Sequence, residues 1–130
     1  MPNQKVWTPH YKNVAGIALA SAARTATVSS VDILNDLAKG VHIVLDVTAV
    51  ADTPSVVLKI EAKDPASGGY YTLLTGAAVT TVSTNIYKVY PGLTASVNAI
   101  VSDVVPKTFR VTLTHADTDS ITYSVGYSLV

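Results

Sequence analysis

The chain has no cysteine among its 130 residues, so it can form neither a disulfide framework nor a metal site with thiolate ligands. Charge is also scarce: 14% of the residues are charged, and nine basic residues balance nine acidic ones. Because no basic stripe stands out, binding to nucleic-acid phosphates is not expected. No apolar run approaches the roughly 20 residues that a membrane span requires, so no membrane partner is expected.

The apolar content is high for a chain with so little charge. Hydrophobic residues make up 48% of the sequence, which favours a surface partly covered by a partner. The alternative is an ordinary β domain whose surface carries threonine and serine in place of charge. A length of 130 residues predicts one domain with a core large enough to fold without cross-links.

The first twenty residues differ from the rest of the chain. Pro2 and Pro9 disfavour regular structure there, so residues 1–20 are predicted to form an N-terminal arm and residues 21–130 the folded domain. A signal peptide is a weaker alternative, since Lys5 precedes a run of small apolar residues but aromatic and proline residues interrupt that run.

Trp7, His10 and Tyr11 make the arm aromatic without strand alternation. Trp7 is the only tryptophan, and a tryptophan in an arm is a plausible interface anchor. We therefore predict that these three residues bind a partner. The alternative is that Trp7 packs back on its own domain.

Four segments show the period-two alternation of strands with one buried face. The last, from Ile121 to Val130, places isoleucine, tyrosine, valine and leucine on one side and threonine, serine and glycine on the other. The same pattern marks residues 41–50, 55–62 and 108–115. Shorter strands are predicted at residues 24–31, 70–74, 78–82, 85–90 and 93–101.

The segment from residue 30 to residue 39 allows either a short helix or a long loop, because Val31, Leu34 and Leu37 recur at helical spacing and Gly40 could end a helix. About eight strands at roughly ten-residue intervals predict an all-β fold, an antiparallel β-sandwich or jelly roll. A parallel α/β fold is not expected, because helical crossovers do not separate the strands.

The sequence offers little catalytic chemistry. No serine lies in a G-x-S-x-G turn, and Glu61 is the only glutamate. His115, Asp117 and Asp119 form the densest group of metal-ligand types, but without the glycine and distal glutamate of a calcium loop they favour a polar β-turn. We therefore predict no enzyme activity, no catalytic residues, no metal and no cofactor.

Tyrosine is the one aromatic residue in quantity, with seven in the chain. Several tyrosines exposed on one face could form a platform for stacking sugars, which would make the chain a carbohydrate-binding β module. The alternative is that most of them fill the core and the rims of the sheets. The residues concerned are Tyr70, Tyr71, Tyr87, Tyr90, Tyr123 and Tyr127.

The stretch from Gly40 to Val130 resembles a recurrent family of small virion proteins of tailed bacteriophages. A weaker match extends over residues 22–30, and Phe109 stands where the family pattern has tryptophan. The segments that carry the resemblance are Gly40-Val41-His42, Asp46-Val47-Thr48, Lys63 to Leu74, Val89 to Thr94, Ser102 to Pro106, Phe109-Arg110-Val111 and His115 to Gly126.

This resemblance implies a capsid decoration, or cement, protein on the exterior of the virion head, assembled in the host cytoplasm. Its partner would be the lattice of the major capsid protein, and a homotrimer is the favoured oligomer because cyclic symmetry lets one interface serve three subunits. The alternative within the same class is a head–tail adaptor, tail or fibre component.

Overall fold

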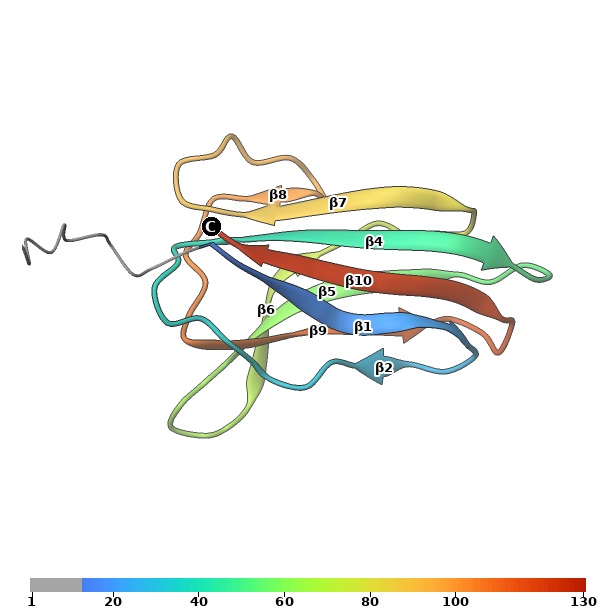
Figure 1. Ribbon diagram of the computed structural model, residues 1–130, viewed down its shortest axis with the longest axis horizontal. Coiled ribbons are helices and arrows are strands. Elements are labelled where there is room, and N and C mark those ends of the chain that lie inside the picture. Colours follow the sequence, from blue (N-terminus) through green and yellow to red (C-terminus); the bar gives the residue numbers. More distant parts are fainter. Residues whose placement is uncertain (1–12) are drawn as a thin grey trace, which may run out of the picture.

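The computed structural model describes residues 13–130, and every regular element in that range is a β-strand. The strands form two packed layers (Figure 1). No helix of the described residues is long and apolar enough to cross a membrane. The strands are β1 (Val14–Arg24), β2 (Val28–Ser29), β3 (Ile33–Leu34), β4 (Val41–Val50), β5 (Val56–Lys63), β6 (Tyr70–Thr75), β7 (Ser83–Val89), β8 (Ile100–Val101), β9 (Thr108–His115) and β10 (Ile121–Leu129).

The order of the strands defines a jelly roll. The first layer, sheet A, has the order β1-β10-β4-β7-β8, and the second, sheet B, has the order β2-β9-β5-β6 with β3 also paired to β9. All pairs are antiparallel except β7 with β8. With β2 and β3 counted as one interrupted strand and the two-residue β8 set aside, eight strands remain in jelly-roll order. The predicted antiparallel β-sandwich is therefore confirmed.

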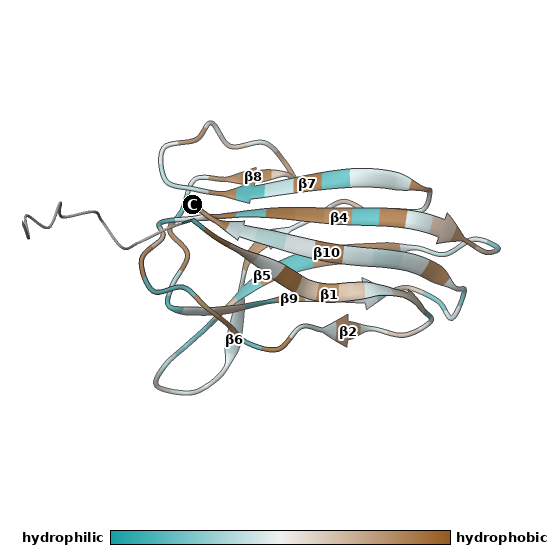
Figure 2. Ribbon diagram, in the orientation of Figure 1, coloured by the Kyte–Doolittle hydropathy of each residue, from teal (hydrophilic) through white to brown (hydrophobic). Residues whose placement is uncertain are grey.

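The core lies between the two sheets and is built by the alternation that the sequence predicts. Along β4 and β5, every second side chain is buried and points at the other layer. Figure 2 shows polar bands at intervals along an otherwise largely apolar β4. Each fully buried aliphatic side chain contributes about 1.5–3 kcal/mol to folding. Fully buried residues include Ile43, Leu45, Leu58, Ile60, Phe109, Leu113, Ile121 and Tyr123.

The predicted boundary of the N-terminal arm is wrong. β1 begins at Val14 and pairs with β10, so residues 14–20 belong to the sheet. Within β1 only Leu19 is buried, and the ladder with β10 shifts register on both sides of it. A strand with two bulges and mostly small side chains shows no period-two alternation, which explains why the sequence did not predict it.

The predicted first strand at residues 24–31 is reduced to β2, because Arg24 ends β1. The segment from residue 30 to residue 39 is a loop that contains β3, and the helical alternative is wrong. Val31, Leu34 and Leu37 are 81%, 59% and 73% exposed, so the helical spacing of these residues has no core to face.

Asn35 holds this loop in place. Its buried side-chain amide donates hydrogen bonds to the carbonyl oxygens of Ala38 and Val105 and accepts one from the Ala38 N–H, each of 2.9 Å. Together with the pairing of β3 to β9, these bonds hold the loop in place without the continuous backbone ladder of a long strand.

The strands predicted at residues 78–82 and 93–101 are also shorter than expected. Val79 makes a single bridge to Val56, and only Ile100 and Val101 pair with β7. Asn98 has a φ of 62°, which reverses the chain within a turn closed by the Ile100 N–H and the Ser96 carbonyl at 3.0 Å. These two loops leave part of the β7 edge uncovered.

Candidate functional site

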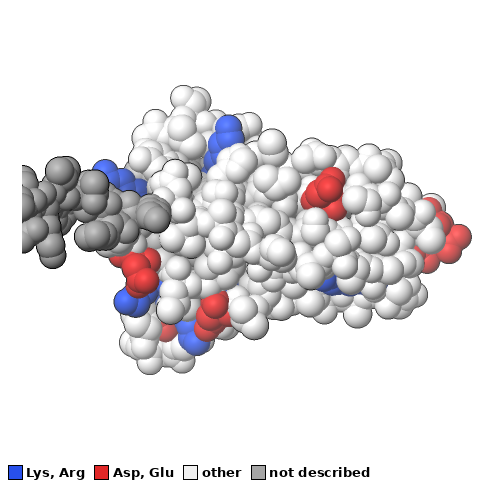
Figure 3. Space-filling model, viewed as in Figure 1, with Lys and Arg blue, Asp and Glu red and all other residues white. Residues whose placement is uncertain are grey.

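The outer face of sheet A is a flat surface with little charge. Alternation along its strands turns Ile43, Leu45 and their equivalents inward, so the residues between them face solvent. Among the outward residues of β1, β10, β4 and β7, only Asp46 and Lys88 carry a full charge. This face lies toward the viewer in Figure 3, where few charged side chains lie over the sheet and most of those in view gather at its edges.

An apolar row crosses this face from one strand to the next. Ile17 pairs with Gly126, Gly126 with Val44, and Val44 with Ile86, so the four residues lie side by side across four strands. Ile17 is 74% exposed and Ile86 48% exposed. Because Gly126 has no side chain, the row is low in its middle and higher at its two isoleucines. We call these four residues the apolar row.

Polar residues flank the apolar row on both sides. On one side Ser128, His42 and Lys88 are register partners, and on the other Ser124, Asp46 and Thr84. The Thr84 hydroxyl donates to Asp46 Oδ1 at 3.2 Å. An apolar centre with a polar rim is the usual composition of a protein interface.

The outer face of sheet B has a different character, because most of its charges are paired with one another. Arg110 Nε donates to Glu61 Oε1 at 3.1 Å, and the guanidinium lies over the Tyr70 ring, with its Cζ 3.5 Å from the ring centroid. The Tyr70 hydroxyl and the Lys63 ammonium both bind Asp32, and these two hydrogen bonds lower the pKa of that carboxyl. This network covers sheet B with its own side chains.

The six tyrosines in the described part of the chain do not form an exposed platform. Tyr123 and Tyr87 are buried in the core, and Arg110 covers one face of Tyr70. Tyr71, at 48% exposed, is the one tyrosine of residues 13–130 among the exposed large hydrophobic residues. The arrangement therefore gives the carbohydrate-binding alternative no site with several stacking rings.

The three residues predicted to bind a partner, Trp7, His10 and Tyr11, lie outside the described residues. Of the predicted metal-ligand types, Asp117 and Asp119 lie in the turn between β9 and β10, as expected. There Asp117 accepts a hydrogen bond from the Asp119 N–H at 3.0 Å, and Asp119 accepts one from the Thr53 N–H at 3.2 Å. Within residues 13–130, no group of three potential ligands could hold a metal ion.

His115 joins a polar cluster at the end of the core. Its Nε2 lies 2.9 Å from the hydroxyl of Tyr123, and its buried Nδ1 has no hydrogen-bond partner among the described residues. The Arg24 guanidinium lies over the Tyr123 ring, 4.7 Å from the centroid, and donates to the Tyr123 carbonyl at 2.8 Å. Burial raises the pKa of Tyr123 to about 12.

Burial lowers the pKa of His115; the nearby Asp117 carboxylate opposes this shift and the Arg24 charge adds to it. Since the unfolded chain then binds a proton more readily than the folded one, the stability that the neutral His115 contributes is fully present above pH 6.5 and falls as pH drops below it.

We expect His115→Gln, which cannot titrate but retains an amide for Tyr123, to lose less stability than the wild type between pH 7.5 and pH 5. Urea unfolding at both pH values measures this, and equal losses would contradict it.

The fold and the surface together define a jelly-roll β-sandwich domain with one weakly charged outer sheet. No protein-family model and no curated protein matches the chain. Among solved structures, the chain is similar to one in the structure of infectious bursal disease virus Gx strain, with a TM-score of 0.54 and 9% identity. The match covers 90% of this chain and 32% of that chain, so this chain spans about a third of the length of its structural neighbour.

Sequence reasoning missed the apolar row. It recognised that β4 has a polar outer face, but it placed Ile17 in an arm and did not connect Val44 with Ile86. The signal available in the sequence was Ile17, a large apolar residue within the uncharged run of mostly small residues from Val14 to Ala23. Only the strand order shows that Ile17, Gly126 and Val44 are neighbours.

Proposed function

We propose that this chain is a structural protein of a virion, and that it decorates the outside of a tailed-bacteriophage head. The observation that carries the proposal is the flat, weakly charged outer face of sheet A with its exposed apolar row. Jelly rolls occur in viral capsid domains, and the solved neighbour comes from a virus structure. The decoration role itself rests on the resemblance of residues 40–130 to small phage virion proteins.

The physical demands of decoration fit this surface. A stable protein interface buries about 800 Å² on each partner, and an open sheet face supplies a surface of that kind. Because charge is sparse there, attachment would depend on apolar contact and hydrogen bonding, and salt would weaken it little. Binding to the assembled lattice but not to its dissociated subunits would stabilise the particle by mass action.

The remaining parts of the proposal concern the partner and the oligomer. The partner is the major capsid protein lattice, with no nucleic acid, membrane, cofactor or catalysed reaction involved. Trp7, His10 and Tyr11 supply further partner contacts, and a homotrimer at lattice three-fold positions lets one interface serve three subunits.

Electron cryomicroscopy of purified particles that carry this chain tests the location. Decoration predicts hundreds of copies spread over the head, with the outer face of sheet A against the capsid. A few copies at one vertex would move the protein to the neck or tail, and absence from the head would contradict the decoration role.

Lysine substitution in the apolar row tests the surface. We expect Ile17→Lys/Ile86→Lys to weaken binding to stripped particles by more than about tenfold, because each ammonium would lose water in the interface. Co-sedimentation of the full-length protein with the particles measures this.

The matched control is Val31→Lys/Leu37→Lys, which adds the same charge at residues that are 81% and 73% exposed outside sheet A. This control should bind like the wild type. If both double variants bound as tightly as the wild type, the outer face of sheet A would not be the contact surface.

A further inference from the structure

Within residues 13–130, part of the edge of β7 has no strand beside it. The Lys88 N–H donates to the Ala99 carbonyl at 2.8 Å and the Tyr90 N–H to the Val101 carbonyl at 3.1 Å, so the even-numbered residues direct their backbone groups away from β4. Alternation gives Thr84 and Ile86 the same orientation. β8 pairs only with Lys88 and Val89, and no other described strand continues along this edge.

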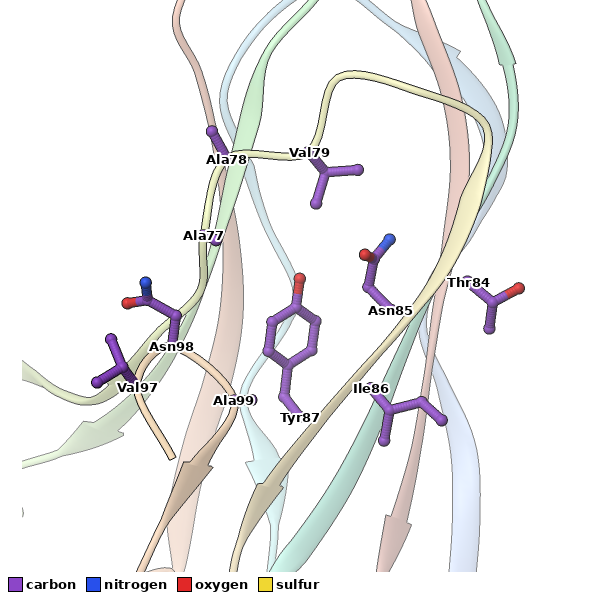
Figure 4. A pocket seen from close by; sticks show the side chains of 10 residues that line it. All are labelled: Ala77, Ala78, Val79, Thr84, Asn85, Ile86, Tyr87, Val97, Asn98 and Ala99. Carbon is purple, nitrogen blue, oxygen red and sulfur yellow. The ribbon is translucent and has the colours of Figure 1, made fainter. Parts of the chain in front are cut away.

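A groove of about 370 Å³ runs beside this uncovered edge (Figure 4). One wall is β7 itself, and the others are the loop before it and the turn before β8. None of the described residues that line the groove is charged, and its polar side chains are Thr84, Asn85, Tyr87 and Asn98. The Tyr87 hydroxyl points into its centre (Figure 4). Its apolar lining consists of Ala77, Ala78, Val79, Ile86, Val97 and Ala99.

Hydrogen bonds hold the walls of the groove in place. The Val79 N–H donates to the Val56 carbonyl at 2.8 Å, and the Gly76 N–H donates to the Leu58 carbonyl at 2.7 Å. A Cβ at Gly76 would lie 2.7 Å from Tyr87 Cε1, so the glycine lets the tyrosine ring pack directly against the loop. Since the groove is formed in advance, an occupant would pay little to order it.

An uncovered strand edge beside an uncharged groove is suited to an extended polypeptide. Such a segment adds to the sheet through main-chain hydrogen bonds, and alternate side chains fill the groove. The N–H and C=O groups of Thr84 and Ile86 offer two donors and two acceptors to it. The lining offers no partner for a charge, so a charged residue of the segment has to point away from it.

We propose that residues 5–8 of a second copy of this chain add to β7 as a short strand in this groove. The sequence of these residues, Lys-Val-Trp-Thr, lies between Pro2 and Pro9 and contains three residue types that favour strands. Both prolines lie outside the tetrapeptide, so each of its four residues has a backbone N–H to donate. This inference specifies a contact between subunits of the oligomer in the proposed function. It does not depend on capsid binding.

The position of β1 points to a second copy as the source. In sheet A, β1 and β7 are separated by β10 and β4, and β1 begins opposite Leu129 at one end of the sheet. A straight continuation before Val14 would leave the sandwich at that end, away from the groove of the same chain. Residues 9–13 link this segment to Val14 and span up to about 20 Å when extended, so the neighbouring molecule has to lie close to this end of the sandwich.

Because the chain has no cysteine, an introduced cysteine is the only thiol that a maleimide can modify, which allows a direct cross-linking test. Full-length Lys5→Cys protein is mixed with full-length Val97→Cys protein of different mass, and a short bismaleimide is added. Val97 lines the groove and is 88% exposed. We expect the mixed product to exceed, by about fivefold or more, the product formed with Ile17→Cys, a control that is 74% exposed on β1.

A second variant tests the groove itself. Ala78→Trp adds an indole at an exposed residue of the lining and should reduce the mixed product several-fold without disturbing the core. Equal yields at Val97 and Ile17, or a yield unaffected by Ala78→Trp, would overturn the inference. So would a double variant, Lys5→Cys/Val97→Cys, that cross-links only within one chain. These outcomes leave particle binding by sheet A intact, so the two proposals fail separately.

Discussion

Phe109→Ala should lower the free energy of unfolding by about 3–5 kcal/mol, which is a third or more of the stability of many single domains. Phe109 is fully buried on β9, and its ring meets Tyr127 of sheet A edge to face, with centroids 6.4 Å apart. Truncation removes a large apolar contact between the two sheets and leaves a cavity. Urea unfolding should show a midpoint lower by roughly 2 M.

The control for this substitution is Tyr71→Ala, which removes an aromatic ring from the same sheet at a residue that is 48% exposed. Its expected cost is about 1 kcal/mol, because its ring is half solvated in the folded state. A similar loss for both variants would contradict the assignment of Phe109 to the centre of the sandwich.

Gly40→Ala should cost roughly 3 kcal/mol, because a Cβ at this residue would overlap backbone as well as side-chain atoms. It would collide with the Val89 carbonyl oxygen and lie 2.7 Å from Tyr90 Cδ2. Gly40 also exchanges two backbone hydrogen bonds with Val130, of 2.9 and 3.0 Å. The strain would therefore loosen the C-terminal end of β10 together with the start of β4.

The matched glycine is Gly126, where a Cβ would meet nothing closer than the Gly16 carbonyl oxygen at 3.8 Å. We expect Gly126→Ala to be neutral or slightly stabilising, since glycine within a strand costs about 0.5–1 kcal/mol relative to alanine. Thermal unfolding of the two variants compares them directly. A stable Gly40→Ala protein would mean that β4 and β7 do not approach as closely as the structure has them.

The sequence carries a clear signal for the strands that form the core. β4, β5, β9 and β10 each place apolar residues at alternate positions along most of their length, and nearly all of the residues predicted to face inward are buried. In such strands one face meets the core and the other meets water, so the pattern is imposed residue by residue.

Other segments lack that signal for identifiable reasons. β1 is interrupted by two bulges, so it presents no regular period and was assigned to an arm. The helical spacing of Val31, Leu34 and Leu37 was misleading because all three side chains are exposed and Asn35 organises the loop through hydrogen bonds. Gly40 looks in the sequence like the end of a helix, whereas the structure requires it for close backbone approach.

The candidate site also has parts that the sequence predicts and parts that it does not. Trp7, His10 and Tyr11 come from composition, and their role stays a prediction because they lie outside the described residues. The apolar row was not predictable, because Ile17 and Val44 become neighbours only when β10 lies between β1 and β4. The groove beside β7 depends on where β8 begins, which is decided by the turn at Asn98.

By itself the sequence determined the all-β class, the inward faces of the long strands and the scarcity of charge, because alternation and composition are local properties of the chain. Tertiary structure alone decided the jelly-roll order, the row of residues across sheet A and the uncovered edge of β7. These features depend on which strands become neighbours, and that choice follows from packing the whole core, so no single segment specifies it.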